Sequence, residues 1–201
     1  MIHARPMIHV HRKYRRYSDE TLMERLQEGD ASSFDELYRR YSRRLLHYFY
    51  RMLNGNGDKA QDFLQDICLT LIEKAHMYNR KGKFSSWVFT IASNMCKNEY
   101  RRNGKRVPLD CVNLDAHAIC PVKTIEEAID QKTFQDCLYK ALYTLDCHKK
   151  NVFLLRFQEQ CTIKEISQIL DCAEGTVKSR LFYTIRYLSK KCQHFRKTFE
   201  V

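Results

Sequence analysis

Two groups of side chains in this 201-residue sequence have types that could hold a metal ion. Asp62 and Asp66 stand one helical turn apart, and paired carboxylates can bind the metal ion of a nuclease. No histidine or third acid stands beside them at ligand spacing, so a docking face for a basic protein and a merely solvated face are competing interpretations. Cys111, His117 and Cys120 could bind zinc, but their spacing matches no familiar ligand pattern. We therefore expect no metal, no cofactor and no catalytic residue.

A third group of side chains, between Gly175 and Leu188, has the chemistry of DNA recognition. Residues 162–181 are typical of two short helices about a tight turn, and the second helix combines an apolar stripe with an unusual outer face. The stripe expected to pack inward consists of Val177, Leu181, Ile185 and Leu188. Two cations, a hydroxyl and two rings on the outer face suit the base edges and methyl groups of a DNA major groove. These outward residues are Lys178, Ser179, Phe182, Tyr183 and Arg186.

A second basic face lies on the helix expected around Trp87. Opposite its apolar stripe, amides and cations recur at helical spacing, which suits contacts with phosphates and base edges, and only Glu99 interrupts them. This face consists of Asn94, Lys97, Asn98, Arg101 and Arg102. The preceding loop, residues 76–85, mixes rings, cations and glycine, a combination that binds unstacked bases, although Phe84 also suits a core position. Its candidate contacts are Tyr78, Asn79, Arg80 and Lys83.

The net charge of +11 is distributed unevenly along the chain. Residues 1–17 carry +5 and residues 171–201 carry +4, whereas residues 107–170 carry −2. Positive charge at two separated places suits a polyanion contacted twice, although a generic solubilising charge is the alternative. Nine cysteines without a Cys-x-x-Cys pair indicate a reducing compartment rather than a disulfide framework. No apolar run approaches the ~20 residues of a membrane span and no signal peptide is recognisable, so we expect a soluble, cytoplasmic protein.

Helical periodicity covers most of the chain and strand signals are almost absent, so the expected fold is all-α. We expect two small helical domains joined by a flexible linker, the second with a helix-turn-helix. The linker contains two prolines and has no apolar period. The segments are a basic N-terminal arm (1–17), an N-terminal helical domain (18–102), the linker (103–123) and a C-terminal domain (124–195).

Cap signals place the boundaries of several helices. Ser18 is expected to begin a helix that runs to about Glu28. Asp30 is expected to begin the next helix, and the run Asn54–Gly57 is a clear break after it. The sequence Thr-Ile-Glu-Glu at residues 124–127 is a capping box that opens the C-terminal set.

In order and spacing, these elements resemble extracytoplasmic-function sigma factors, the small two-domain initiation subunits of bacterial RNA polymerase. The resemblance covers roughly residues 18–192, and it rests on several motifs in the same order rather than on one. The matching blocks are Phe34-x-x-Leu37-Tyr38-x-x-Tyr41; Ala60-Gln61-Asp62-Phe63-Leu64-Gln65-Asp66 followed by Leu69; Phe84-x-x-Trp87-x-x-x-Ile91-Ala92-x-Asn94 with Arg101-Arg102; Val152-Phe153-Leu154-Leu155-Arg156; Ile166-Ser167-x-Ile169-Leu170; and Gly175-Thr176-Val177-Lys178-Ser179-Arg180-Leu181.

The resemblance implies a role for each of these faces. The loop at residues 76–85 would hold a base flipped from the melted −10 element, and the basic face of the Trp87 helix would follow the adjacent strand and duplex. Docking on the clamp helices of the largest subunit of core RNA polymerase would fall to Asp62, Gln65, Asp66 and Leu69. Reading of the −35 element would fall to Thr176, Lys178, Ser179, Phe182 and Tyr183, with Arg180 on phosphate. The chain would do no chemistry itself, and an anti-sigma factor would hold it inactive.

Two other functions stay open from the residues alone. A polymerase-independent helix-turn-helix regulator explains residues 162–189 but leaves the basic helix and the acidic face unexplained. The second alternative function is a nuclease that acts through Asp62 and Asp66, the two aspartates of the acidic face.

The sequence also departs from the family pattern at the turn. Asp171 stands where glycine is usual, so either it adopts a left-handed conformation or the turn differs. Glu174 replaces an apolar residue at the start of the second helix, where it can repel phosphate and alter promoter choice.

Overall fold

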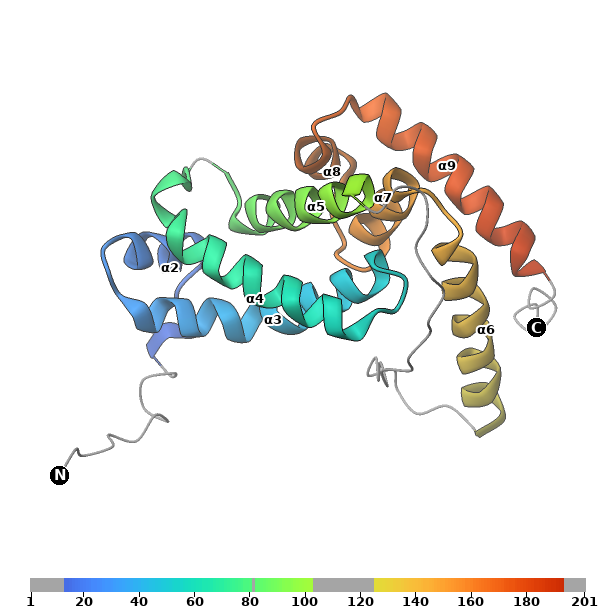
Figure 1. The fold of residues 1–201 in the computed structure, drawn as a ribbon, viewed down its shortest axis with the longest axis horizontal. Coiled ribbons are helices and arrows are strands. Elements are labelled where there is room, and N and C mark those ends of the chain that lie inside the picture. The colour runs from blue at the N-terminus through green and yellow to red at the C-terminus, as the bar shows by residue number, and fades with distance from the viewer. Residues whose placement is uncertain (1–12, 81, 103–124, 194–201) are drawn as a thin grey trace.

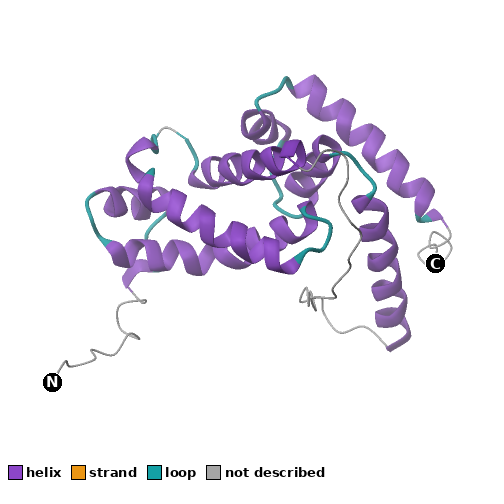
Figure 2. Ribbon diagram, in the orientation of Figure 1, coloured by secondary structure: helices purple, strands orange, loops and turns teal. Residues whose placement is uncertain are grey.

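The computed structural model describes residues 13–80, 82–102 and 125–193, and every regular element within them is helical (Figure 1, Figure 2). The N-terminal set consists of α2 (Asp19–Gln27), α3 (Ala31–Met52), α4 (Gly57–Glu73), the 3-10 helix η1 (Ala75–Met77) and α5 (Phe84–Arg102). The C-terminal set consists of α6 (Ile125–Tyr143), α7 (Cys147–Phe157), α8 (Ile163–Leu170) and α9 (Glu174–Lys191). The all-α fold expected from periodicity is confirmed. Most of the basic arm, the linker and the capping-box residue Thr124 lie outside the described residues.

Side-chain caps begin α2 and α3 where the sequence indicated. The Ser18 hydroxyl accepts the backbone N–H of Thr21 at 3.2 Å, and Asp30 Oδ1 accepts that of Ser32 at 3.1 Å. A reciprocal capping box begins α8. Each cap satisfies a backbone donor that the helix itself leaves unpaired, which is worth about 1 kcal/mol. The caps therefore fix where the faces of α2, α3 and α8 start.

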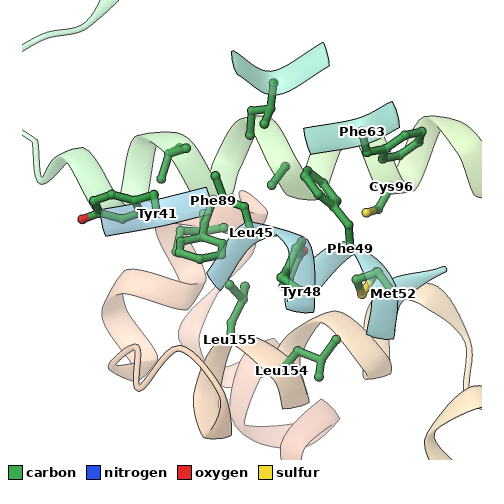
Figure 3. Packing of buried hydrophobic residues seen from close by; sticks show 14 of the residues in the cluster. Tyr41, Leu45, Tyr48, Phe49, Met52, Phe63, Phe89, Cys96, Leu154 and Leu155 are labelled. Atoms are coloured by element: carbon green, nitrogen blue, oxygen red, sulfur yellow. The ribbon is translucent and has the colours of Figure 1, made fainter. Parts of the chain in front are cut away.

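The inward stripe of α3 is the centre of the N-terminal core (Figure 3). Tyr48, Phe49 and Met52 have no exposed surface. After a short turn α4 returns along α3, and the rings of Phe49 and Phe63 meet edge to face with centroids 5.4 Å apart. Phe89 of α5 meets Tyr48 in the same way at 5.4 Å. Full burial of each such side chain contributes about 1.5–3 kcal/mol, so this cluster holds α3, α4 and α5 together.

The C-terminal helices pack onto the N-terminal ones. α8 contacts α5 and α7 contacts α3, so Leu154 and Leu155 lie beside Tyr48 (Figure 3). The buried side chains of both sets form one continuous hydrophobic cluster. α6 and α9 run side by side away from this contact (Figure 1). No helix among the described residues is long and apolar enough to cross a membrane.

The inward stripe of α9 differs from the expected one at a single position. Val177, Leu181 and Leu188 are buried as expected, but Ile185 is 45% exposed and Thr184 is fully buried instead. At 3.6 residues per turn, position 184 lies about 40° from the centre of this stripe and position 185 lies about 60° away. Helix geometry therefore places the hydroxyl inward and the larger apolar side chain outward.

Candidate nucleic-acid interface

The outer face of α9 presents two neighbouring aromatic rings to solvent. Phe182 is 61% exposed and Tyr183 is 57% exposed, and their rings meet edge to face with centroids 5.4 Å apart. The other predicted contacts of this helix are exposed (Lys178, Ser179, Arg186) or half-buried (Thr176, Arg180). Exposed apolar surface flanked by cations marks a place where a partner binds. The structure thus brings the seven predicted −35 residues onto one helix, although two of them reach solvent only in part.

The turn before α9 keeps the geometry that glycine supplies elsewhere. Asp171 ends α8 with φ 50° and ψ 59°, in the left-handed region that Asp and Asn adopt more readily than other side chains. α9 then begins at Glu174 without a side-chain cap from Ala173. The first backbone N–H groups of such a helix carry partial positive charge, which suits a phosphate.

One face of α5 carries amides and cations. The predicted contacts on this face are Asn94, Asn98, Arg101 and Arg102, which are exposed, and Lys97, which is half-buried. Glu99, expected to interrupt them, is buried away from this face, where it forms an ion pair with Lys59 of α4. The basic face of α5 is therefore free of the acid that the sequence had placed on it.

Tyr78 lies in the core rather than on the surface of the loop before α5. It is 6% exposed, its hydroxyl donates to the carbonyl oxygen of Gly82 at 2.7 Å, and its ring packs against Phe84 and Trp87. Burial raises the pKa of this phenol to about 12. The expectation that Tyr78 contacts a base is wrong for this structure, because the ring that would stack on the base anchors the loop instead.

The remaining predicted contacts of the loop are at the surface. Asn79 is exposed, Arg80 forms an ion pair with Glu24 of α2 at 2.6 Å, and Lys83 forms one with Glu165 of α8 at 2.6 Å. The Lys83 hydrogen bond lowers the pKa of the Glu165 carboxyl to about 2. Both cations stay largely in solvent, so a phosphate could replace either carboxylate at little cost.

The acidic face of α4 is exposed at all four predicted docking positions, Asp62, Gln65, Asp66 and Leu69. Leu69 is 59% exposed, and two further large apolar side chains that follow it in the sequence, Ile72 and Met77, are 49% and 62% exposed. Within the described residues, no group of three or more His, Cys, Asp or Glu side chains could hold a metal ion. The candidate zinc residues Cys111, His117 and Cys120 lie outside those residues.

Sequence reasoning missed the polar residues that join the two helical sets. The Tyr48 hydroxyl donates to Asn151 Oδ1 at 2.8 Å, and Asn151 Nδ2 donates to the Ser93 hydroxyl at 2.7 Å. The Lys150 ammonium donates to the Tyr100 hydroxyl at 2.8 Å. In the sequence these side chains look like ordinary helix-surface residues. The one available signal is that Lys150 and Asn151 directly precede the apolar run of α7.

Comparison with known proteins assigns both helical sets. The family model of Sigma-70 region 2 matches residues 37–106, and that of Sigma-70 region 4 matches residues 135–183. The ECF RNA polymerase sigma-E factor of Haemophilus influenzae is 26% identical over 183 residues, covering 88% of this chain and 96% of that protein. The RNA polymerase sigma-H factor of Pseudomonas aeruginosa is 26% identical over 182 residues, with 87% and 94% covered.

Two solved structures have the same fold. CnrH, in complex with the cytosolic domain of CnrY, gives a TM-score of 0.64 at 17% identity and covers 86% of this chain and 95% of its own. The sigma factor RpoE of Bartonella quintana, in complex with the anti-sigma factor NepR, gives 0.65 at 20% identity, with 81% and 98% covered. Because both sigma-70 regions are matched in order and the sigma-E and sigma-H relatives align over nearly their whole length, this chain belongs to the extracytoplasmic-function sigma factors of RNA polymerase.

Proposed function

We propose that the chain is an alternative sigma factor that binds core RNA polymerase and directs initiation at promoters with a −35 and a −10 element. The observation that carries this proposal is the presence of two exposed nucleic-acid faces, one in each matched region. α9 would enter the major groove of the −35 element, with Lys178 and Ser179 at base edges and Phe182 and Tyr183 against methyl groups. Arg180 and the open first turn of α9 would hold phosphate.

At the −10 element, the basic face of α5 would follow the backbone and the loop before it would hold an unstacked base. Asn79 is the exposed residue next to Tyr78, and Arg80 and Lys83 flank it. Tyr78 anchors this loop to the core and does not touch the base. Among the described residues, neither face carries a group of His, Cys, Asp or Glu side chains that could hold a metal ion. We infer that the role of both faces is to bind and position DNA.

The acidic face of α4 is the proposed docking surface for core polymerase. Exposed carboxylates at Asp62 and Asp66 beside the apolar Leu69 suit a partner that offers cations around an apolar groove. The similar RpoE of Bartonella quintana is bound to an anti-sigma factor. We infer that this chain likewise has an anti-sigma partner that covers one or more of its exposed faces, and that it works in the bacterial cytoplasm.

Reconstituted transcription tests this function. The purified protein is mixed with core RNA polymerase and genomic DNA, and transcripts are mapped. The proposal predicts co-elution with the polymerase and initiation at discrete sites, both abolished in the double variant Asp62→Lys/Asp66→Lys. Because both side chains are exposed, helical circular dichroism of this variant should match that of the wild type. Binding to DNA without binding to polymerase would instead favour an independent helix-turn-helix regulator.

A further inference from the structure

Two cysteine thiols meet where α6 packs along the end of α9. The sulfurs of Cys137 and Cys192 lie 3.2 Å apart, although the two residues are 55 positions apart in the sequence. Cys137 belongs to α6, and Cys192 directly follows the last residue of α9, with its backbone N–H bonded to the carbonyl oxygen of Leu188 at 2.9 Å. A disulfide bond joins sulfurs about 2.05 Å apart, so a small side-chain rotation is enough to bring this pair to bonding distance.

The packing of the two helices holds these thiols together. α6 and α9 run side by side (Figure 1). At another level of the same helix pair, the hydroxyls of Thr144 and Tyr187 are hydrogen-bonded at 2.8 Å. The cysteine contact lies about 10 Å from this bond along the helices, at 1.5 Å per residue. Because two contacts at separate levels define how α6 and α9 pack, the approach of the thiols is a property of the packed helices.

The two thiols differ in their access to solvent. Cys137 is half-buried, whereas Cys192 is 7% exposed. Burial raises the pKa of Cys192, and the hydrogen bond with Cys137 and the charge of its thiolate raise it further. Cys192 therefore keeps its proton and donates it to the neighbouring sulfur. A reagent from solvent meets Cys137 first, and Cys192 is in place to react with the product.

We propose that Cys137 and Cys192 form a redox-active dithiol, which a small-molecule disulfide converts into an intramolecular disulfide bond. The Cys137 thiolate attacks one sulfur of the oxidant and forms a mixed disulfide, and the other half of the oxidant leaves and takes up a proton. Cys192 then gives up its proton and attacks the Cys137 sulfur, which releases the second half as a thiol. Two protein thiols are thus oxidised to one disulfide, and one disulfide of the oxidant is reduced to two thiols.

Several other thiols of the described residues are poor competitors for the oxidant. Burial raises the pKa of both Cys147 and Cys161 to about 11, and it raises that of Cys96 well above its usual value. Since the thiolate is the attacking species, these cysteines react slowly at neutral pH. In a reducing compartment the resting state of the pair is the dithiol, and the bond forms when small disulfides accumulate.

The bond would tie α9 to α6 at the end of α9 that lies away from its DNA-reading residues. Lys178 and Ser179 are exposed near the start of α9, about 20 Å from Cys192 along the helix at 1.5 Å per residue. The bond also closes a loop of about 55 residues, which restrains the unfolded chain. Oxidation would therefore stabilise the C-terminal set and leave its DNA face open. That face rests on the proposed function, whereas the dithiol rests on the contact between α6 and α9.

Reaction of the full-length protein with glutathione disulfide tests the pair. The background variant Cys111→Ser/Cys120→Ser removes the two thiols outside the described residues. We expect mass spectrometry to show the loss of two hydrogens, reversed by dithiothreitol, and peptide mapping to place the bond between Cys137 and Cys192. Cys192→Ser should instead keep one glutathione on Cys137, whereas Cys137→Ser should leave Cys192 unmodified. A bond between other cysteines, or mixed disulfides alone in the background variant, would overturn the proposal.

Thermal unfolding of the same proteins measures what the bond does. We expect the oxidised background variant to unfold about 10 °C above its reduced form, with the same helical circular dichroism. This difference should vanish in Cys192→Ser and persist in Cys68→Ser, which replaces a half-buried cysteine of α4 as the matched control. Equal midpoints for the oxidised and reduced forms would overturn the stabilising role of the bond.

Transcription with core RNA polymerase separates the dithiol from the proposed function. We expect the oxidised and reduced forms to initiate equally, because the bond lies away from the DNA-reading residues. Loss of initiation on oxidation that Cys192→Ser prevents would overturn the claim that the DNA face stays open. A mapped, stabilising bond in a protein that initiates in neither form would uphold the dithiol and overturn the sigma-factor function.

Discussion

Thr184 carries the one buried side-chain polar atom among the described residues that has no hydrogen-bond partner. Its side chain lies in the inward stripe of α9 between Leu181 and Leu188 and has no exposed surface. An unpaired buried hydroxyl costs free energy that an apolar group of the same shape avoids. We expect Thr184→Val to raise the free energy of unfolding by about 1 kcal/mol in urea denaturation. Thr184→Ser is the control: it keeps the hydroxyl and removes the methyl group, so a gain in stability there would contradict the reason given.

Single residues also show how far side-chain type alone predicts a role. The exposed contacts on α9 follow from helical spacing, since a face opposite an apolar stripe must meet solvent or a partner. Tyr78 could not be assigned from spacing, because a tyrosine in a loop of mixed composition suits a base contact or a core position equally well. Its neighbours Phe84 and Trp87 decide the matter, and only the folded loop brings them against its ring.

At the scale of the helix, α9 separates two kinds of DNA contact. Lys178 and Ser179 are exposed near its start, where a recognition helix meets base edges, whereas Lys190 is exposed in its last turn. We expect Lys178→Ala or Ser179→Ala to change the preferred −35 sequence and to weaken binding by about 1–3 kcal/mol for each base-specific hydrogen bond removed. Initiation from a library of −35 sequences, with Lys190→Ala as the control, measures this. An equal decrease on every sequence would assign the residue to phosphate binding.

Helix boundaries were largely predictable because caps are local chemistry. Ser18 and Asp30 accept backbone N–H groups within three residues, so their role is written in adjacent positions. Asp171 was left between two possibilities, and the structure selects the left-handed conformation. The polar pair at the start of α7 was not predictable, because periodicity assigns Lys150 and Asn151 to a surface and only another helix can bury them. Spacing along one helix carries no information about what packs on it.

At the scale of the whole molecule, the packing of the two helical sets shows more clearly what sequence periodicity cannot predict. Periodicity predicts two sets of helices, and the family resemblance predicts two DNA-binding units, but neither says whether the sets touch. The contact depends on shape and on a few polar groups far apart in sequence: Asn54 and Lys150, Tyr48 and Asn151, Arg44 and Glu159. Because these pairs use common side chains at ordinary helical positions, they become visible only when the helices are placed together.

The buried ammonium of Lys150 makes the stability of the packed molecule depend on pH. Burial lowers its pKa from 10.5 to about 8. Between these values the unfolded chain holds a proton that the folded chain has released, so this group adds stability as pH rises from 8 to 10.5. Below pH 8 both states are charged and the full cost of burial applies. The gain across the window is about 3 kcal/mol at 1.36 kcal/mol per pKa unit.

Comparison with Lys150→Met isolates this effect, since methionine does not titrate. Groups near the ammonium that titrate in the same range in the unfolded chain are Cys96, Cys147 and Tyr100. Asp146 also lies nearby, but its lowered pKa keeps it ionised throughout this range, and Tyr143 faces the ammonium as a ring. Burial raises the pKa of the Cys147 thiol to about 11, so this group opposes Lys150 in both proteins and largely cancels in the difference. We expect the stability of Lys150→Met relative to wild type to fall between pH 8 and 10.5, by urea denaturation in reductant. Lys149→Met controls for the removal of a surface cation, and a difference for Lys150→Met that stays constant with pH would show that its ammonium is hydrated in the folded protein.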